Sequence, residues 1–411
     1  MDAERDILVL RELVKQLLEV CERDVQRERR ELWRRHNSLE HMRPPVLVRY
    51  GCCEWEIIQP LLVCRDPFFR EHEHRLRSLI LQDGIGDDYV FEPWITQRAS
   101  VILPDGGPWG VAWNIVWSGQ AGKGYHCNPA LIRLDDMERL VTPCHRIDEQ
   151  KTIRNFDRIT EAVGDLIEVN MDRSPHWSNI QADISTDLGY LRGHENMMLD
   201  IIDWPDELHR LLAFMRDGIL KAQEEAEIAG DWNLTGHFNQ SMPYVRTLRD
   251  PKANSGPVSR KELWIYMAAQ EMTAVSPAHH DEFMLNYQIP VMEKFGLAAY
   301  GCCEDLSRKI DILRKVRNLR RIAVTPFADV QACAEQIGID YVCSYRPNPA
   351  LMVCYGFDEK KAKAILKKDL AIFKKFDCVV DICLKDVQTV QGDPGRLAQF
   401  AKIARAASEE Y

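Results

Sequence analysis

The chain has 411 residues, of which 45% are apolar and 28% charged, a balance typical of globular proteins. Its net charge of -10 gives no basic excess that would favour a nucleic-acid partner. No apolar run reaches the ~20 residues that a membrane span needs. The first residues are acidic and lack the apolar stretch of a signal peptide, so we expect a cytoplasmic protein with mostly reduced cysteines.

Residues 4–40 predict one long amphipathic helix, because leucines recur at helical spacing between charged residues. Pro44 and Pro45 end it, since proline lacks the backbone N–H that a helix needs. We therefore predict an N-terminal helical extension, residues 1–43, before a catalytic domain, residues 44–411. The helix either packs against that domain or forms the contact of a homodimer, which is the oligomer that we expect.

The first half of the predicted domain mixes both element types. Residues 46–50 are apolar and β-branched, which predicts a strand, and residues 51–54 then read Gly-Cys-Cys-Glu. Residues 109–129 are rich in Gly and Trp without long periodicity, which indicates a substrate loop or a lid. The other elements predicted here are strands at 89–94, 99–103 and 165–170, and helices at 68–81, 153–163 and within 188–229.

The C-terminal half alternates regularly between strands and helices. Strands are predicted at 262–269, 297–300, 321–325, 340–344 and 378–383, and helices at 306–316, 328–337, 359–373 and 394–407. Such alternation predicts a parallel sheet. About eight strands in a chain of this length predict an α/β fold of the closed (β/α)8 TIM-barrel type.

One strand tip carries residues that packing does not require. The strand at 297–300 is followed by Gly301, Cys302, Cys303 and Glu304, which repeats the four residues at 51–54. In α/β barrels the catalytic groups lie at the C-terminal ends of the strands. Successive side chains of a strand alternate in direction, so at most one of the two cysteines is expected to act in chemistry. Zinc binding, core packing and redox sensing remain alternatives for this pair.

Several short motifs resemble the uroporphyrinogen decarboxylase superfamily. They are Leu-Arg-Gly-His-Glu at 191–195, Asp-Trp-Pro-Asp-Glu at 203–207, and Gln270-Glu271 followed by Ser276-Pro277. The resemblance implies a TIM barrel, and either a zinc-dependent methyltransferase or a cofactor-free decarboxylase or lyase. Such methyltransferases move a methyl group between a corrinoid on a partner protein and a small acceptor. The chain departs from the pattern by lacking an Arg-rich loop after the first strand and a His-x-Cys strand tip.

We expect the methyltransferase, with the decarboxylase as the alternative and a non-catalytic partner-binding barrel as a third possibility. Zinc and a partner-bound cobalamin are the expected cofactors. The resemblance and the strand-tip positions together predict the site residues. They are catalytic Glu271, Glu304 and Arg49; substrate-binding Tyr50, Trp55, Tyr300, Asp329 and Arg346; and metal-binding His237, Cys302 and Cys303.

Overall fold

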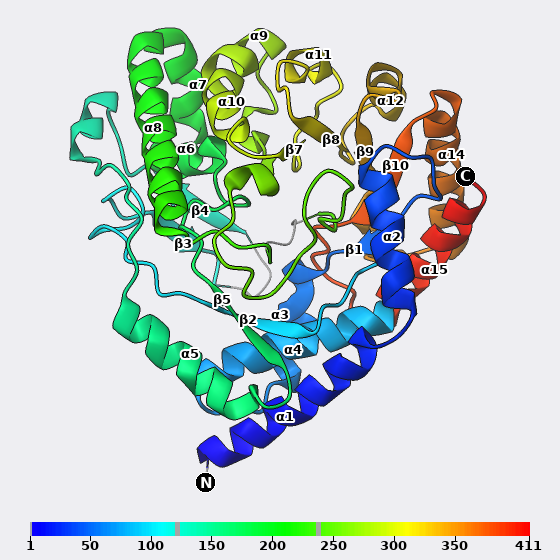
Figure 1. Ribbon diagram of the computed structural model, residues 1–411. Coiled ribbons are helices and arrows are strands. Elements are labelled where there is room, and N and C mark those ends of the chain that lie inside the picture. Colours follow the sequence, from blue (N-terminus) through cyan, green and yellow to red (C-terminus); the bar gives the residue numbers. More distant parts are fainter. Residues whose placement is uncertain (1, 120–123, 236–239) are drawn as a thin grey trace.

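The computed structural model describes residues 2–119, 124–235 and 240–411 as a mixed α/β fold (Figure 1). Its parallel strands form a six-stranded sheet in the order β1-β10-β9-β8-β7-β6 and a two-stranded sheet of β2 and β5. The bounds of these strands are β1 Val46–Val48, β2 Trp94–Arg98, β5 Glu168–Asp172, β6 Trp264–Met267, β7 Leu297–Tyr300, β8 Leu319–Val324, β9 Val342–Tyr345 and β10 Val379–Leu384.

The ring of strands is not closed, which corrects the prediction of a closed (β/α)8 barrel. At the free edge of β1, Val46 N donates to Asp88 Oδ2 at 2.9 Å and Val48 N donates to Asp87 Oδ2 at 2.8 Å. These carboxylates take the hydrogen bonds that a neighbouring strand would accept. At the free edge of β6, Tyr266 N donates to the Asn179 carbonyl at 2.8 Å. The fold is therefore TIM-like, with two seams at β1 and β6.

Helices follow most of these strands, as the alternation predicts. Their starts are set by aspartates, for example Asp66, Asp183 and Asp358, whose carboxylates accept backbone N–H groups of the first turn. The helices longer than six residues are α1 Asp2–Cys21, α2 Val25–Asn37, α4 Pro67–Ile85, α5 Glu149–Val163, α6 Ile184–Arg192, α7 His194–Asp203, α8 Pro205–Ala229, α10 Asn286–Met292, α12 Val330–Ile337, α14 Glu359–Lys375 and α15 Gly395–Glu409.

The N-terminal region is two helices, not the single helix predicted for residues 4–40. Helix α1 packs Leu10 and Leu17 into the same buried cluster as Leu76 of α4. Helix α2 ends against the six-stranded sheet, where His36 Nε2 lies 2.9 Å from Asp381 Oδ2 of β10. Arg321 of β8 donates to the same carboxylate oxygen at 2.6 Å. Both helices thus share buried contacts with the strands that follow them.

Two further local predictions are corrected. Residues 89–93 and 99–103 form no strand, and only Val101 makes an isolated bridge, to Ile147. Within the loop or lid predicted at 109–129, β3 Asn114–Trp117 and β4 Tyr125–Asn128 form an antiparallel hairpin. No helix in the described parts of the chain is long and apolar enough to cross a membrane.

Candidate functional site

The turn after β7 places two sulfur atoms side by side. Gly301 has a φ of 104°, a conformation that residues with a side chain rarely adopt. A Cβ at this position would also lie 2.7 Å from the Cβ of Ala323 on β8. The following turn brings the sulfurs of Cys302 and Cys303 to 3.6 Å. Because the residues have left the strand, both side chains reach the same point, which strict alternation along a strand would forbid.

Lys385, the residue after β10, lies between these thiols. Its ammonium is 3.0 Å from Cys302 Sγ and 3.6 Å from Cys303 Sγ, and its side chain is buried. The hydrogen bond from the Cys303 thiol lowers the pKa of Cys302 to about 4, with help from the charges of Lys385 and Arg346 and against the effect of burial. The same hydrogen bond, together with burial, raises the pKa of Cys303. These contacts favour a Cys302 thiolate beside a protonated Cys303, whose sulfur also lies 3.3 Å from Asp386 Oδ2.

Arg346, at the tip of β9, holds this turn. Its guanidinium donates to the carbonyls of Cys302 and of Gly301, the latter at 3.0 Å, and to the side-chain oxygen of Gln240. Arg346 is 3% exposed, and these groups satisfy its two terminal nitrogens, while its Nε is buried without a partner among the described residues. In this arrangement Arg346 supports the thiolate. Substrate binding, the role predicted from the sequence, stays a prediction.

Glu304 and Tyr300 are also tied into the protein. Both carboxylate oxygens of Glu304 accept backbone amides, from Ala269 at 2.9 Å and from Cys302 at 2.7 Å. The Tyr300 hydroxyl donates to Gln288 Oε1 at 2.8 Å and lies 2.8 Å from His280 Nε2. Glu304 thus joins the tips of β6 and β7 and positions Cys302.

Glu271 lies beside a second group of carboxylates, after β6. It accepts hydrogen bonds from Ser185 and, at 3.4 Å, from Thr186 on helix α6. Burial raises the pKa of the nearby Asp187 to about 6, although two indole N–H groups donate to its carboxylate and the Glu271 charge adds little. Burial also raises the pKa of Asp183, with a contribution from Glu271. Glu271 therefore sits near two carboxyl groups whose burial favours the protonated form.

The other predicted residues lie away from the thiols or serve the fold. Arg49 and Tyr50 line a separate cavity beside β1, and the Tyr50 hydroxyl donates to the Ser78 carbonyl. Trp55 is 40% exposed. The Asp329 carboxylate caps helix α12 by accepting from Ala332 N at 3.0 Å. His237 lies outside the described residues.

The predicted zinc site has two candidate ligands in the described part of the chain. The 3.6 Å between the sulfurs of Cys302 and Cys303 is close to the about 3.8 Å expected between two thiolates on one tetrahedral zinc ion. Among the described residues, however, no three His, Cys, Asp or Glu side chains form a metal-binding group. The predicted third ligand, His237, precedes by three residues Gln240, whose amide lies 3.8 Å from Cys302 Sγ. Lys385 contacts both sulfurs and would compete with the metal.

The sequence does not show whether the side chain of Lys385 faces the barrel mouth or solvent. In the structure this residue contacts both thiols, at 3.0 and 3.6 Å. The available signal was a lysine directly after six consecutive buried residues of β10. It also left Cys52 unassigned. The pKa of the Cys52 thiol responds, after burial, to the charges of Asp386, Lys385 and Cys302. Both Gly-Cys-Cys-Glu strings therefore approach the same lysine, a convergence that depends on how the sheet curls.

No protein-family model matches the sequence, and no curated protein is similar to it. Among solved structures, the chain is similar to a methyltransferase from Methanosarcina mazei, with a TM-score of 0.50 over 93% of this chain and 97% of that chain. The sequence identity is 11%. At that identity the likeness shows a shared fold, which agrees with the TIM-like arrangement of the strands.

Proposed function

We propose that the chain is a methyltransferase whose chemistry takes place at Cys302. The observation that carries this proposal is a half-buried sulfur with its pKa lowered to about 4, held 3.0 Å from the Lys385 ammonium at the end of β7. Thiolates are strong nucleophiles and metal ligands, whereas thiols are neither. A structural neighbour that bears the name methyltransferase is consistent with methyl transfer on this fold.

Zinc is part of the proposal, with Cys302, Cys303 and His237 as its ligands. When bound, zinc would lower the pKa of an acceptor thiol, so that this thiol is ionised near neutral pH. Glu304 and Arg346 hold the turn that carries Cys302, and the Cys303 thiol, with Lys385, favours the ionised form of its sulfur when no metal is present.

The proposed substrates are a small acceptor and a methylated corrinoid carried by a partner protein. The acceptor sulfur forms a bond to the methyl carbon with its own electron pair. The bond between the methyl group and its donor breaks, and the donor keeps the electrons of that bond. The test supplies methylcobalamin and a small thiol to the wild-type protein, Cys302→Ser and the exposed-site control Glu335→Gln.

The expected result is methyl transfer by the wild-type protein and by Glu335→Gln, with loss of at least about 100-fold in Cys302→Ser, a factor typical of removing a group that acts in the transition state. Zinc is measured in the same samples by elemental analysis. One zinc per chain in the wild type, lost in Cys302→Ser and in His237→Ala, supports the metal. Transfer that is equal in Cys302→Ser contradicts the proposal, and a fully active protein without metal removes zinc from it.

A decarboxylase or lyase is the second candidate, and one observation favours it. Burial raises the pKa of Asp187 to about 6 and raises that of Asp183 as well, and both carboxyl groups lie near Glu271, so groups able to give and take a proton lie close together. This function requires Glu271 and not Cys302. Activity that survives chelators and Cys302→Ser, but is lost in Glu271→Gln, would select it.

A further inference from the structure

The seam beside β1 opens into a cavity that the site at Cys302 does not include. It has a volume of about 360 Å³ and lies between the tip of β1 and helix α4. Arg49, Tyr50 and Gly51 line it from the strand side, and Ser78, Leu79 and Gln82 line it from the helix. At the edge of β1 beside this cavity, the backbone N–H groups donate to the carboxylates of Asp87 and Asp88 and not to a neighbouring strand.

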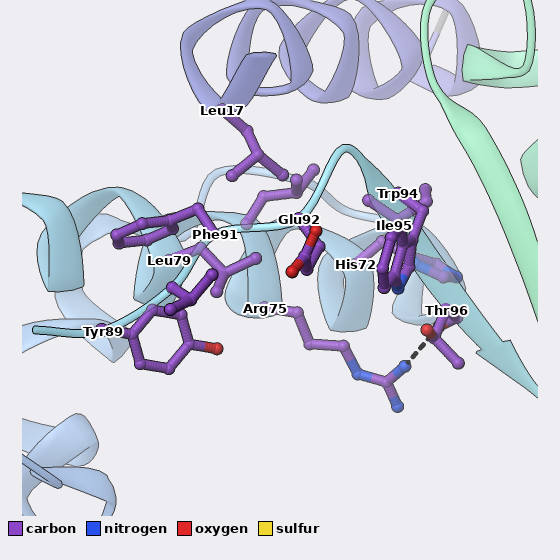
Figure 2. Close-up of a pocket in the computed structure, with 12 residues that line it drawn as sticks. Leu17, His72, Arg75, Leu79, Tyr89, Phe91, Glu92, Trp94, Ile95 and Thr96 are labelled. Atoms are coloured by element: carbon purple, nitrogen blue, oxygen red, sulfur yellow. Dashed lines mark hydrogen bonds between the residues drawn. The ribbon is translucent and has the colours of Figure 1, made fainter. Parts of the chain in front are cut away.

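A second, apolar cavity of about 180 Å³ adjoins the first, and the two share Arg75, Leu79 and Tyr89 as lining residues. Figure 2 shows Leu17 reaching toward this space from α1, with Leu79 and Phe91 beside it. The two adjoining cavities, here together called the seam pocket, are polar at the β1 end and apolar under α1.

Arg49 is the cation of the seam pocket that is able to bind a ligand. The Arg49 guanidinium makes no hydrogen bond or ion pair with any residue that the structure describes, although its charge lowers the pKa of Tyr50 and of Tyr89 against the larger effect of burial. An arginine in this state is ready to bind a carboxylate through two parallel hydrogen bonds.

The other charged groups of the seam pocket are already satisfied. Glu54 accepts from Ser78 at 3.1 Å and lies 3.6 Å from His74. Glu92 pairs with Arg30 at 2.9 Å, and Arg75 donates to the Thr96 carbonyl at 3.1 Å, a contact drawn in Figure 2. Among the described residues that line this pocket, one cation without a partner stands beside two acidic side chains, which favours a ligand with one negative charge over one with two, and hence a carboxylate over a phosphate monoester.

We infer that the seam pocket binds an organic carboxylate with an unbranched apolar chain. The carboxylate pairs with Arg49, and the chain extends past Leu79 toward Leu17 and Phe91. Gly51 borders this pocket, and the next residue, Cys52, is close enough to Lys385 and Cys302 for their charges to act on its thiol. In the proposed methyl transfer the acceptor is a small thiol that carries such a carboxylate and chain, and the inference rests on that proposal only for the reaction. Binding itself is independent of it.

Calorimetry with octanoate tests the pocket, with 1-octanol, acetate and octyl phosphate as comparison ligands. The proteins are wild type, Arg49→Gln, Leu79→Phe, Cys302→Ser and Arg210→Gln, which removes an exposed arginine of α8 as a matched control. We expect one octanoate per chain in the wild type, in Cys302→Ser and in Arg210→Gln. Arg49→Gln should weaken binding about 10- to 100-fold, the usual effect of losing a charge-assisted hydrogen bond. The neutral alcohol and acetate should each bind more weakly than octanoate.

Leu79→Phe narrows the apolar end of the seam pocket. It should weaken the binding of octanoate more than that of the shorter butanoate, which is measured in the same way. This comparison tests the inference even if Arg49→Gln fails to fold. Octanoate that does not bind the wild type, or that binds Arg49→Gln and Leu79→Phe as well as it binds the wild type, overturns the inference. Octyl phosphate that binds more tightly than octanoate also overturns it. Intact octanoate binding without any methyl transfer contradicts the proposed function alone.

Discussion

At the scale of single residues, the ionisation of Cys302 depends on a few close contacts. The Cys303 thiol contributes most to lowering its pKa, followed among the favourable contributions by Lys385 and Arg346. Burial acts in the opposite direction, because it disfavours any charge. A thiolate in this position exists because a hydrogen-bond donor and two cations surround it.

Cys303→Ala should therefore raise the pKa of Cys302, by about one to two pH units for the loss of one hydrogen bond to a charged group. Cys303→Ser is the matched control, since its hydroxyl keeps the donor, and the pKa of Cys302 should stay near that of the wild type. Thiolate absorbance followed over pH measures both. Equal values in the alanine and serine variants would show that the hydrogen bond has no such effect.

At the scale of elements, two buried carboxylates link strands to one another and to a helix, in addition to the hydrogen bonds of the sheet. Glu304 ties the tip of β7 to the tip of β6 through two backbone amides. Asp381 ties β10 to β8 and to helix α2 through Arg321 and His36. Neither role follows from the sequence, because the partners are distant in the chain.

Glu304→Gln should lower the free energy of unfolding by about 1–3 kcal/mol, since an amide group cannot accept from both backbone N–H groups and one is left unsatisfied. The exposed Glu335→Gln on α12 is the control and should change it by less than about 0.5 kcal/mol. Urea denaturation measures the two variants. A Glu304→Gln protein as stable as the control would mean that this carboxylate does not hold the turn.

Asp381→Asn should lower the free energy of unfolding further, by about 3–5 kcal/mol, because it leaves the buried Arg321 charge without its counter-ion. The control is Asp377→Asn, whose side chain is 78% exposed and whose removal should cost at most about 0.5 kcal/mol. Both are measured by urea denaturation. Near-equal stabilities of the two variants would contradict a structural role for the pair of Arg321 and Asp381.

At the scale of the whole molecule, the sequence predicts the strands of the C-terminal half well, those of the first half less well, and the closure of the barrel wrongly. Strands β6 to β10 lie within one or two residues of their predicted positions, because buried parallel strands are short apolar runs between helical patterns. The two seams were not predictable, since they depend on Asp87, Asp88 and Asn179, which carry no strand pattern. The Cys302–Cys303 tip was found from its composition. Its link to Lys385 was not, because it requires the curl of the sheet.

The N-terminal helices, predicted as an extension before the catalytic domain, pack against that domain and share its buried interior. Removal of residues 1–43 should therefore prevent cooperative folding, because Arg321 and Asp381 would lose His36 and Asn37, and the α4 cluster would lose Leu10 and Leu17. Removal of residues 1–3 alone is the control and should leave the melting temperature unchanged. Circular dichroism during heating measures both. A shortened protein that melts like the full chain would show that residues 44–411 fold independently.

The central claim is that Cys302 is a thiolate at neutral pH in the folded, metal-free protein. It is tested by the rate of iodoacetamide alkylation at Cys302 as a function of pH, with the modified residue located by tandem mass spectrometry. A group with a depressed pKa is ionised at every pH above it, so the rate should be nearly constant from pH 5 to 8 and should fall only as the pH approaches about 4. A rate that instead rises through this range toward a midpoint of about 8.5, the value of an ordinary cysteine, would contradict the claim.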